Sequence, residues 1–455
     1  MRFVDRKILR ELAALAVPMV ISQGAFALMI FCDRLFLSMV SPLHMAAGLG
    51  GGVASFFCLS LFMGTLAYSN ALVAQYYGSG ELHKCARVLT QSLILSVGFA
   101  PLLLILGIVV SFLFEVMGHA PEQVQLERDY FFVLIGGAVL TLFKVSLASF
   151  FTGTGKTKVV MFADVVGVAL NVPLTYGLIF GAWGMPELGI VGAGIGTIIG
   201  NCISLVILLL FYFYRSHRQQ YHISEAWHFD RGITRRYLKL GVPSGFEMFL
   251  NVAAFNLFLL MFQSYGVAEA ASAAIVLNWD IMAFIPMLGL NAAVVSLVGR
   301  NVGAADMARV GQVIRSGFVL GLGYTSVVAV LFLVLRGPLV EVFLNGEPID
   351  AEIRQLSMFM MLGMASYVVA DGTIQVAGGS LRGAGDTVWL MKTSITLHWL
   401  MLLAQIVVIK VLELGPGASW VVFVLMILAL AGSYVWRLMS GGWRTRAISI
   451  ASGSV

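Results

Sequence analysis

Asp33 lies in the apolar segment ALMIFCDRLFLSMV, residues 27–40, and Arg34 follows it directly. In membrane hydrocarbon, either charge costs about 2.5 to 3.5 kcal/mol on insertion scales, and acids at such positions are functional by default. Adjacent helical residues point about 100° apart, so Arg34 is a poor partner for Asp33. We therefore expect Asp33 to be a protonatable or cation-binding carboxylate and Arg34 to extend toward the outer interface.

A second set of acids lies in the other half of the chain. Asp371 is near the middle of the run 355–381, and Tyr367 precedes it by one helical turn on the same face. Glu247 and Asp280 lie in two other apolar runs. Two carboxylates and a phenol oxygen can hold a sodium ion or share one proton, because like charges at close range cannot both ionise without a cation. We expect Asp371, Glu247 and Tyr367 to form such a site, with Asp280 as a further acid.

The composition is that of an integral membrane protein. Hydrophobic residues make up 59% of the 455 and charged residues 11%, whereas a soluble domain carries about 25% charged residues. The four cysteines include no CxxC pair, which argues against a disulfide framework or a zinc site. The basic start of the chain leads directly into an apolar run that is too long for a signal peptide, so we expect a retained first helix.

Polar interruptions divide the chain into apolar runs long enough to cross hydrocarbon, which takes about 20 residues in a helix. The sequence predicts twelve such runs: 12–40, 46–75, 88–117, 128–152, 158–181, 188–214, 238–266, 270–300, 312–336, 355–381, 388–412 and 418–440.

The distribution of basic residues predicts the orientation of these spans. The two termini and the loops on their side hold 22 of the Lys and Arg residues, and the opposite loops hold four. The positive-inside rule then places both termini in the cytoplasm of a bacterial inner membrane. This bias also accounts for the net charge of +5 without a nucleic-acid partner.

The two halves of the sequence repeat each other. Pro18 matches Pro243, Gly64 matches Gly289 and Gly78 matches Gly303, each pair being 225 residues apart. "FTGTGKT" also matches "LRGAGDT" at an offset of 230. We expect an N-lobe at 1–214, a cytoplasmic linker at 215–236 and a C-lobe at 237–455. Because each repeat has an even number of spans, a pseudo-two-fold axis along the membrane normal should relate the two six-helix lobes.

Two motifs that resemble nucleotide-binding loops fail on inspection. "FTGTGKT" lacks the first glycine of a phosphate-binding loop, because that position is Phe150. "GAGIGTIIG" is not GxGxxG, because Thr197 stands at the last glycine position. Small residues there should instead let helices pack closely. We expect neither ATP-driven transport nor an enzyme activity.

Taken together, these features resemble the multidrug and toxic compound extrusion (MATE) family in its NorM-like branch. The resemblance extends over nearly the whole chain. It rests on Pro18, Asp33, "VAQYYGSGE", "GTGKTK", "LNVPLTYGLIFGAWGMPELGIVGAG", Pro243, "VLNWDIMAFIPMLGLNAAVVSLVGRNVGA" and "DGTIQVAGGSLRGAGDT".

The resemblance assigns roles to several polar residues. Asn171 matches a fifth-helix asparagine that lies near the first-helix acid, and Asp371 matches the family's cation-linked acid. Asp164 precedes Asn171 by seven residues on the same helical face and could extend that network, or it could be a solvated or capping acid. The family more often has an acid where this chain has Asn251, and Glu247, one turn away, could substitute for it.

These features predict an ion-coupled antiporter that exports amphipathic organic cations by alternating access. The coupling ion would be H⁺, Na⁺ or both, with no other cofactor. A Na⁺ site would use Asp371, Glu247 and Tyr367. We expect a monomer whose partners are its substrates and membrane lipids. The alternative is a flippase for lipid-linked oligosaccharides or lipids, which would favour a deep cationic cavity. A channel is disfavoured because a two-lobe repeat with asymmetric acids suits alternation.

Overall fold

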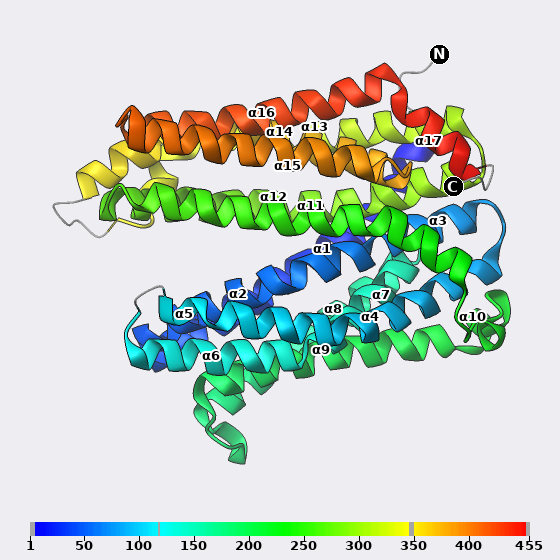
Figure 1. Ribbon diagram of the computed structural model, residues 1–455, viewed down its shortest axis with the longest axis horizontal. Coiled ribbons are helices and arrows are strands. Elements are labelled where there is room, and N and C mark those ends of the chain that lie inside the picture. Colours follow the sequence, from blue (N-terminus) through cyan, green and yellow to red (C-terminus); the bar gives the residue numbers. More distant parts are fainter. Residues whose placement is uncertain (1–4, 117–118, 345–349, 452–455) are drawn as a thin grey trace. The chain divides into compact units, whose positions relative to one another are not determined.

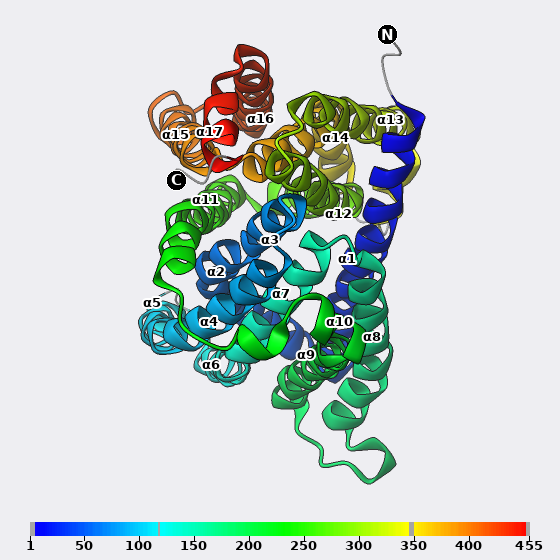
Figure 2. The same ribbon diagram turned by 90° about the vertical axis from the view of Figure 1, so that its right-hand side faces the viewer.

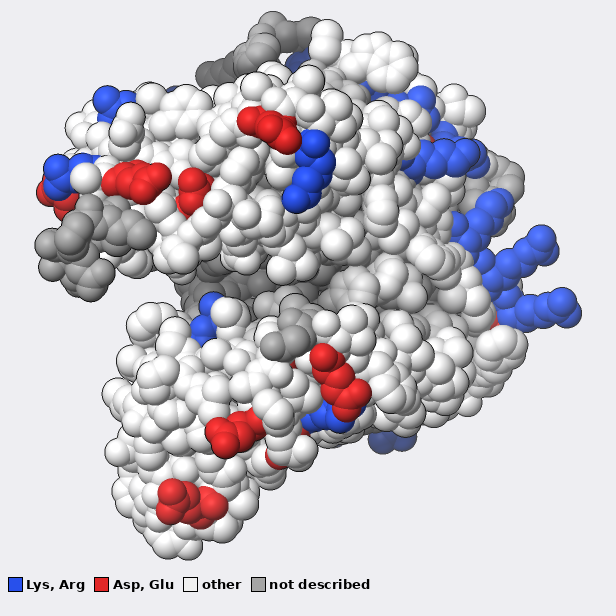
Figure 3. All heavy atoms as spheres, turned by 60° about the vertical axis from the view of Figure 1, so that its left-hand side comes forward, with Lys and Arg blue, Asp and Glu red and all other residues white. Residues whose placement is uncertain are grey.

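The protein is almost entirely helical. The computed structural model describes residues 5–116, 119–344 and 350–451, and no strand occurs among them. Eleven helices are long and apolar enough to span a membrane, and the bent pair α6 and α7 brings the number up to twelve if it counts as one span. On the face displayed in Figure 3, uncharged side chains predominate. The all-α, multi-span fold class is therefore confirmed.

The described residues form two compact units whose boundaries fall inside helices. One unit, here the C-unit, takes in the residues up to Val20 and those from Leu250 onward. The other, here the N-unit, is Ile21–Phe249. Helices α1 (Arg6–Val40) and α11 (Arg231–Gln263) each contribute to both units. The predicted division into lobes at the linker 215–236 assigns each of these two helices to a single lobe. That division stays a prediction.

The N-unit contains the helices between these two boundaries, and Figures 1 and 2 both show α8 and α9 running side by side. After the second part of α1, its elements are α2 (Pro42–Ala67), α3 (Ser69–Gly78), α4 (Leu82–Ser111), α5 (Leu113–Val116), α6 (Pro121–Gly136), α7 (Ala138–Gly153), α8 (Thr157–Phe180), η1 (Ala182–Gly184), α9 (Gly189–Phe213), α10 (Arg215–Gln220), η2 (Ile223–Glu225) and the first part of α11.

In the C-unit, α14 is the central helix and packs against α12, α13 and α16. Figure 1 shows α13, α14, α15 and α16 running alongside one another. The elements after α11 are α12 (Val267–Gly303), α13 (Met307–Glu341), α14 (Asp350–Gly383), α15 (Thr387–Ile406), η3 (Val407–Val411), α16 (Pro416–Ser440) and α17 (Gly442–Ala451). The short helix α17 lies beyond the last predicted run.

Repeated glycines explain why the unit boundaries fall inside α1 and α11. A Cβ on Gly64 of α2 would lie 2.9 Å from the Gly245 backbone of α11. A Cβ on Gly289 of α12 would lie 2.5 Å from the Val20 backbone of α1. Both residues of the second contact lie 225 positions from those of the first. In the N-unit the glycine of α2 packs against α11, and in the C-unit the equivalent glycine of α12 packs against α1.

A second repeated contact joins the helix ends that follow. A Cβ on Gly153 would meet Val73 at 2.9 Å, and a Cβ on Gly383 would meet Val298 at 3.0 Å. The next turn also repeats, because Gly155 and Gly385 have φ values of +79° and +81°. Left-handed backbone of this kind favours glycine, which has no Cβ to clash. The internal repeat read from the sequence therefore corresponds to repeated structure.

The predicted span 128–152 is bent at a pair of glycines. The axes of α6 and α7 differ by 46°, and the break falls at Gly136 and Gly137. A Cβ on Gly137 would lie 2.4 Å from the Ile198 side chain of α9. Glycine pairs are a recognised cause of helix kinks, and here the missing side chain also lets α9 approach the bend.

Candidate functional site

Asp33 is buried in the N-unit, and one hydroxyl group binds it. Its side chain on α1 is only 5% exposed. The hydroxyl of Thr197 on α9 donates to Oδ2 of Asp33 at 2.9 Å, whereas Oδ1 has no hydrogen-bond partner among the described residues. Arg34 is exposed and forms no ion pair within the described parts of the chain, so it does not neutralise its neighbour. An acid with one neutral donor and one unpaired oxygen is suited to accept a proton or cation.

Helix α9, which carries Thr197, packs closely against α8. A Cβ on Gly196 would lie 2.1 Å from Thr175 Oγ1, and a Cβ on Gly200 would lie 2.8 Å from the Asn171 side chain. A Cβ on Gly192 would meet the Leu178 carbonyl oxygen at 2.4 Å. The glycines are therefore required for the two helices to approach, as expected from the segment "GAGIGTIIG".

Asn171 lies on this same interface but does not donate to Asp33. Its side chain is fully buried, and its Nδ2 donates to Thr175 Oγ1 at 3.1 Å. Its Oδ1 has no hydrogen-bond partner among the described residues. The structure therefore makes Thr197, and not Asn171, the direct hydrogen-bond donor to Asp33, and the predicted role of Asn171 in coupling stays a prediction.

Asp164 belongs to a separate buried network. Its Oδ1 lies 2.9 Å from Lys144 Nζ of α7, and Ser22 of α1 donates to its Oδ2. Lys144 also donates to Asn201 Oδ1 at 3.2 Å. Ser22 precedes Asp33 by eleven residues, which is about 16 Å along a helix. Asp164 is thus paired with a lysine, instead of extending the network of Asp33 or acting as a solvated cap.

Removing one partner of this ion pair should destabilise the protein strongly. We expect Lys144→Met to lower the free energy of unfolding by about 3 to 5 kcal/mol, because Asp164 would be left buried and uncompensated. The double variant Lys144→Met/Asp164→Asn should recover most of this loss, since it leaves no lone charge. Thermal unfolding in detergent measures both. A double variant as unstable as the single one would show that side-chain packing, and not charge pairing, is responsible.

In the C-unit, two acids and a tyrosine lie together between α12 and α14. Asp280 on α12 interacts electrostatically with both Tyr367 and Asp371 on α14. The Tyr367 hydroxyl is close to the Asp280 carboxylate, but neither Tyr367 Oη nor Asp280 Oδ1 has a partner at direct hydrogen-bonding geometry among the described residues. Tyr367 is buried against the rings of Trp420 and Phe423. The structure therefore groups Asp280, and not only Tyr367, with Asp371.

The other two predicted C-lobe residues have another contact or belong to the other unit. Asn251, at the start of the C-unit part of α11, donates to Ser394 Oγ on α15 at 2.7 Å. The ring of His398 contacts the Ser394 carbonyl oxygen at 2.8 Å. Glu247 is buried on α11 but belongs to the N-unit. The grouping of Glu247 with Asp371 therefore stays a prediction.

The described residues include no cluster of three or more His, Cys, Asp or Glu side chains suited to a metal ion. The set with the right chemistry for a hard cation is Asp280, Tyr367 and Asp371, which offers carboxylate and phenol oxygens.

Sequence reasoning missed three polar residues of the N-unit, of which Glu127 is buried and Lys144 and Thr197 are partly buried. Lys144 is an ionisable residue inside a predicted span, which is itself the signal that could have identified it. Glu127 is fully buried, and it accepts from Gln123 at 2.9 Å and contacts His119 at 3.0 Å. Thr197 carried no signal, because threonine is common in transmembrane helices.

Comparisons with known proteins agree with this architecture. The family model MatE matches residues 18–177 and 243–405. A probable multidrug resistance protein NorM from Bradyrhizobium diazoefficiens is 26% identical over 434 residues, which cover 94% of this chain and 92% of the relative.

Solved structures share the fold at low sequence identity. The eukaryotic MATE transporter AtDTX14 superposes with a TM-score of 0.88 at 14% identity, covering 99% of each chain. A MOP superfamily transporter from Pyrococcus furiosus, described as having a binding pocket of reverse polarity that suggests a different function, superposes with a TM-score of 0.86 at 18% identity, covering 97% of this chain and 96% of its own. Because the family model spans most of both halves, this chain belongs to the MATE family of multi-span membrane transporters.

Proposed function

We propose that this MATE-family transporter exports amphipathic organic cations by exchanging them for inward-moving protons. The observation that carries the proposal is a pair of acid sites inside the helical units: the buried Asp33 with a single hydroxyl donor in the N-unit, and the partly buried Asp280 with Asp371 in the C-unit. The name of the NorM relative supports export of drug-like compounds. Sodium is the competing coupling ion, because the oxygens of Asp371, Tyr367 and Asp280 also suit it.

The chemistry of coupling follows from burial. Desolvation favours the neutral form of a carboxyl group, and exposure to water favours the charged form. An acid that changes exposure between inward-open and outward-open states therefore changes its proton affinity, and linkage makes that change reciprocal with substrate binding. One charge crossing 100 mV supplies about 2.3 kcal/mol, enough for roughly a 50-fold concentration gradient.

The proposal includes a monomer in a bacterial inner membrane with both termini cytoplasmic. The basic residues of the predicted cytoplasmic loops support this orientation.

Transport assays in vesicles of defined ion content test the coupling ion. We expect reconstituted protein to accumulate a fluorescent organic cation when a pH gradient is imposed without sodium, and to lose most of that accumulation with a protonophore. Accumulation that ignores the pH gradient and rises steeply with sodium on the opposite side would overturn the proton assignment. Movement of a lipid-linked sugar without drug transport would favour the flippase alternative.

A further inference from the structure

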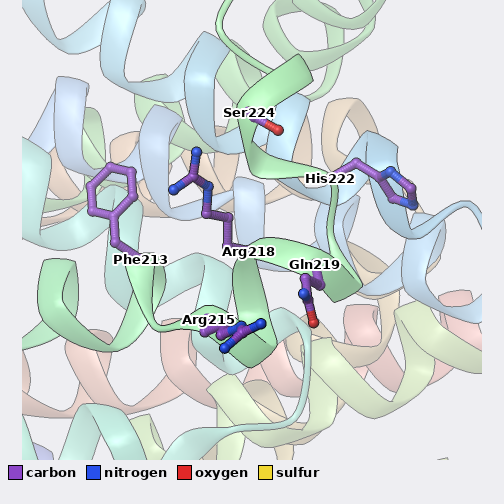
Figure 4. Close-up of a pocket in the computed structure, with 6 residues that line it drawn as sticks. All are labelled: Phe213, Arg215, Arg218, Gln219, His222 and Ser224. Carbon is purple, nitrogen blue, oxygen red and sulfur yellow. The ribbon is translucent and has the colours of Figure 1, made fainter.

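The N-unit carries a basic hollow at the turn that follows α9. It has a volume of about 740 Å³ and is lined by Phe213, Arg215, Arg218, Gln219, His222 and Ser224. Figure 4 shows these six side chains around α10 and η2. The hollow lies in the predicted cytoplasmic linker, next to the end of a membrane-spanning helix. Its side chains would therefore face the level of the lipid head groups.

The positive charge of this hollow is available for a ligand. Arg215 and Arg218 are exposed, and neither has an ion-pair partner in the part of the chain that the structure describes. Lys156 donates from Nζ to Gln220 Oε1 of the same short helix α10 at 3.3 Å. Burial, and then the charge of Lys156, lower the pKa of His217, so its ring adds no positive charge at neutral pH. Two unpaired guanidinium groups therefore dominate the hollow, and guanidinium suits phosphate.

An apolar groove adjoins the basic hollow. It has a volume of about 510 Å³ and runs between α4, α7 and α9, with Trp227 and Phe229 at one end. The two rings are 52% and 60% exposed, which is typical of aromatic residues at a membrane interface. Phe213 of the basic hollow stacks on Trp227 of the groove, with ring centres 6.2 Å apart and planes at 10°. The stacked pair marks the border between a charged and an apolar surface.

The segment that forms this border is held in place by specific contacts. Gln91 of α4 donates to the His228 carbonyl oxygen at 2.8 Å and accepts from the Asp230 amide at 3.1 Å. Tyr221 is fully buried against the edge of Phe150, with ring centres 5.2 Å apart. Both hollows are therefore parts of one preformed surface, which lowers the entropy cost of ordering a ligand on it.

We propose that this surface binds one anionic phospholipid, with its phosphate at Arg215 and Arg218 and its acyl chains in the apolar groove beyond Trp227. Charge complementarity selects an anionic head group, because a zwitterionic lipid would bring a cation to two unpaired arginines. The adjoining groove selects a lipid over free phosphate, since a small anion would leave its apolar surface unused. The proposal is independent of the transported substrate.

Native mass spectrometry of the delipidated full chain tests this site, with dioleoyl phosphatidylglycerol and dioleoyl phosphatidylcholine as probes. We expect the wild type to retain one phosphatidylglycerol in preference to phosphatidylcholine. Arg215→Gln/Arg218→Gln should weaken phosphatidylglycerol binding by about tenfold or more, because each basic residue near an anionic lipid surface changes the affinity several-fold. Both arginines are exposed, so the thermal midpoint should not change.

The matched control is Arg235→Gln/Lys239→Gln, which removes two exposed positive charges from α11 in the same unit. This variant should bind phosphatidylglycerol as the wild type does. An equal loss in the control would show diffuse attraction and overturn the site, as would equal retention of the two lipids. Displacement of the bound lipid by millimolar inorganic phosphate would show a simple anion site and overturn the role of the groove.

Discussion

Asp33→Asn is expected to reduce drug export to background while leaving the protein folded and inserted. The substitution keeps the shape of the side chain and can keep the hydrogen bond from Thr197, because an amide oxygen accepts as a carboxylate does. It removes the ability to gain and lose a proton at a buried position. The measurements are drug resistance in efflux-deficient cells and accumulation in vesicles, each normalised to expression and to the thermal midpoint.

Glu127→Gln provides a matched control for this substitution. Glu127 is a buried acid of the same unit, but Gln123 and His119 occupy its carboxylate. We expect this variant to change stability more than transport. Full resistance from Asp33→Asn at normal expression would show that Asp33 is structural and would remove the basis of the proposed N-unit coupling. A Thr197→Val variant separates the hydrogen bond from the charge, because it keeps the acid and deletes its donor.

The sequence could predict Asp33 because a charge in an apolar run is visible without knowing its surroundings. It could not predict Thr197, which reaches Asp33 of α1 from α9, a helix packed closely on α8. The glycines that allow this approach were recognised as packing residues, but a glycine motif does not indicate which side chain it brings to the acid. A charge inside an apolar run can therefore be recognised from the sequence, whereas its hydrogen-bond partner is determined by the packing between helices.

Helical spacing in the sequence predicts which residues share a face of a helix, but it does not predict which neighbours each of them contacts. Asp164 shares a face with Asn171, yet the two bind different parts of the N-unit, because seven residues correspond to about 10 Å along a helix. Lys144, the partner of Asp164, comes from another helix altogether. Glu247 and Asn251 are one turn apart, but the boundary between the units falls between them. No periodicity in the sequence marks that boundary.

The repeats were predictable because they are a property of the residues themselves. Gly64 and Gly289, which are 225 residues apart, make equivalent close contacts with backbone. In a comparison of the two halves of the sequence they appear only as a matching glycine. The sequence alone does not show that these glycines bind the beginnings of α11 and α1. The sequence therefore predicts the repeat of the two halves, and its division of them at the linker stays a prediction.

The C-unit site leads to a prediction about coupling between two acids. We expect Asp280→Asn and Asp371→Asn each to reduce transport severely, and the double variant to be little worse than the poorer single one. The charge of Asp280 acts on Asp371, so the two carboxylates should exchange one proton or one cation as a unit. Residues in one network give non-additive losses, whereas independent residues give additive ones. Initial rates of vesicle transport for the four proteins measure this cycle.

Asn251→Ala gives the cycle its control, because Asn251 donates to Ser394 on α15 and not to Asp280 or Asp371. The loss of transport caused by Asn251→Ala should add to the loss caused by Asp371→Asn. Glu247→Gln can be combined with Asp371→Asn in the same way, and a non-additive result there would restore Glu247 to the site that the sequence predicted. If Asp280 and Asp371 were to give additive losses, they would not share a proton or cation. Coupling would then have to rest on Asp371 alone or on the acid of the N-unit, and the exchange of one charge for one drug cation would need to be assigned to Asp33.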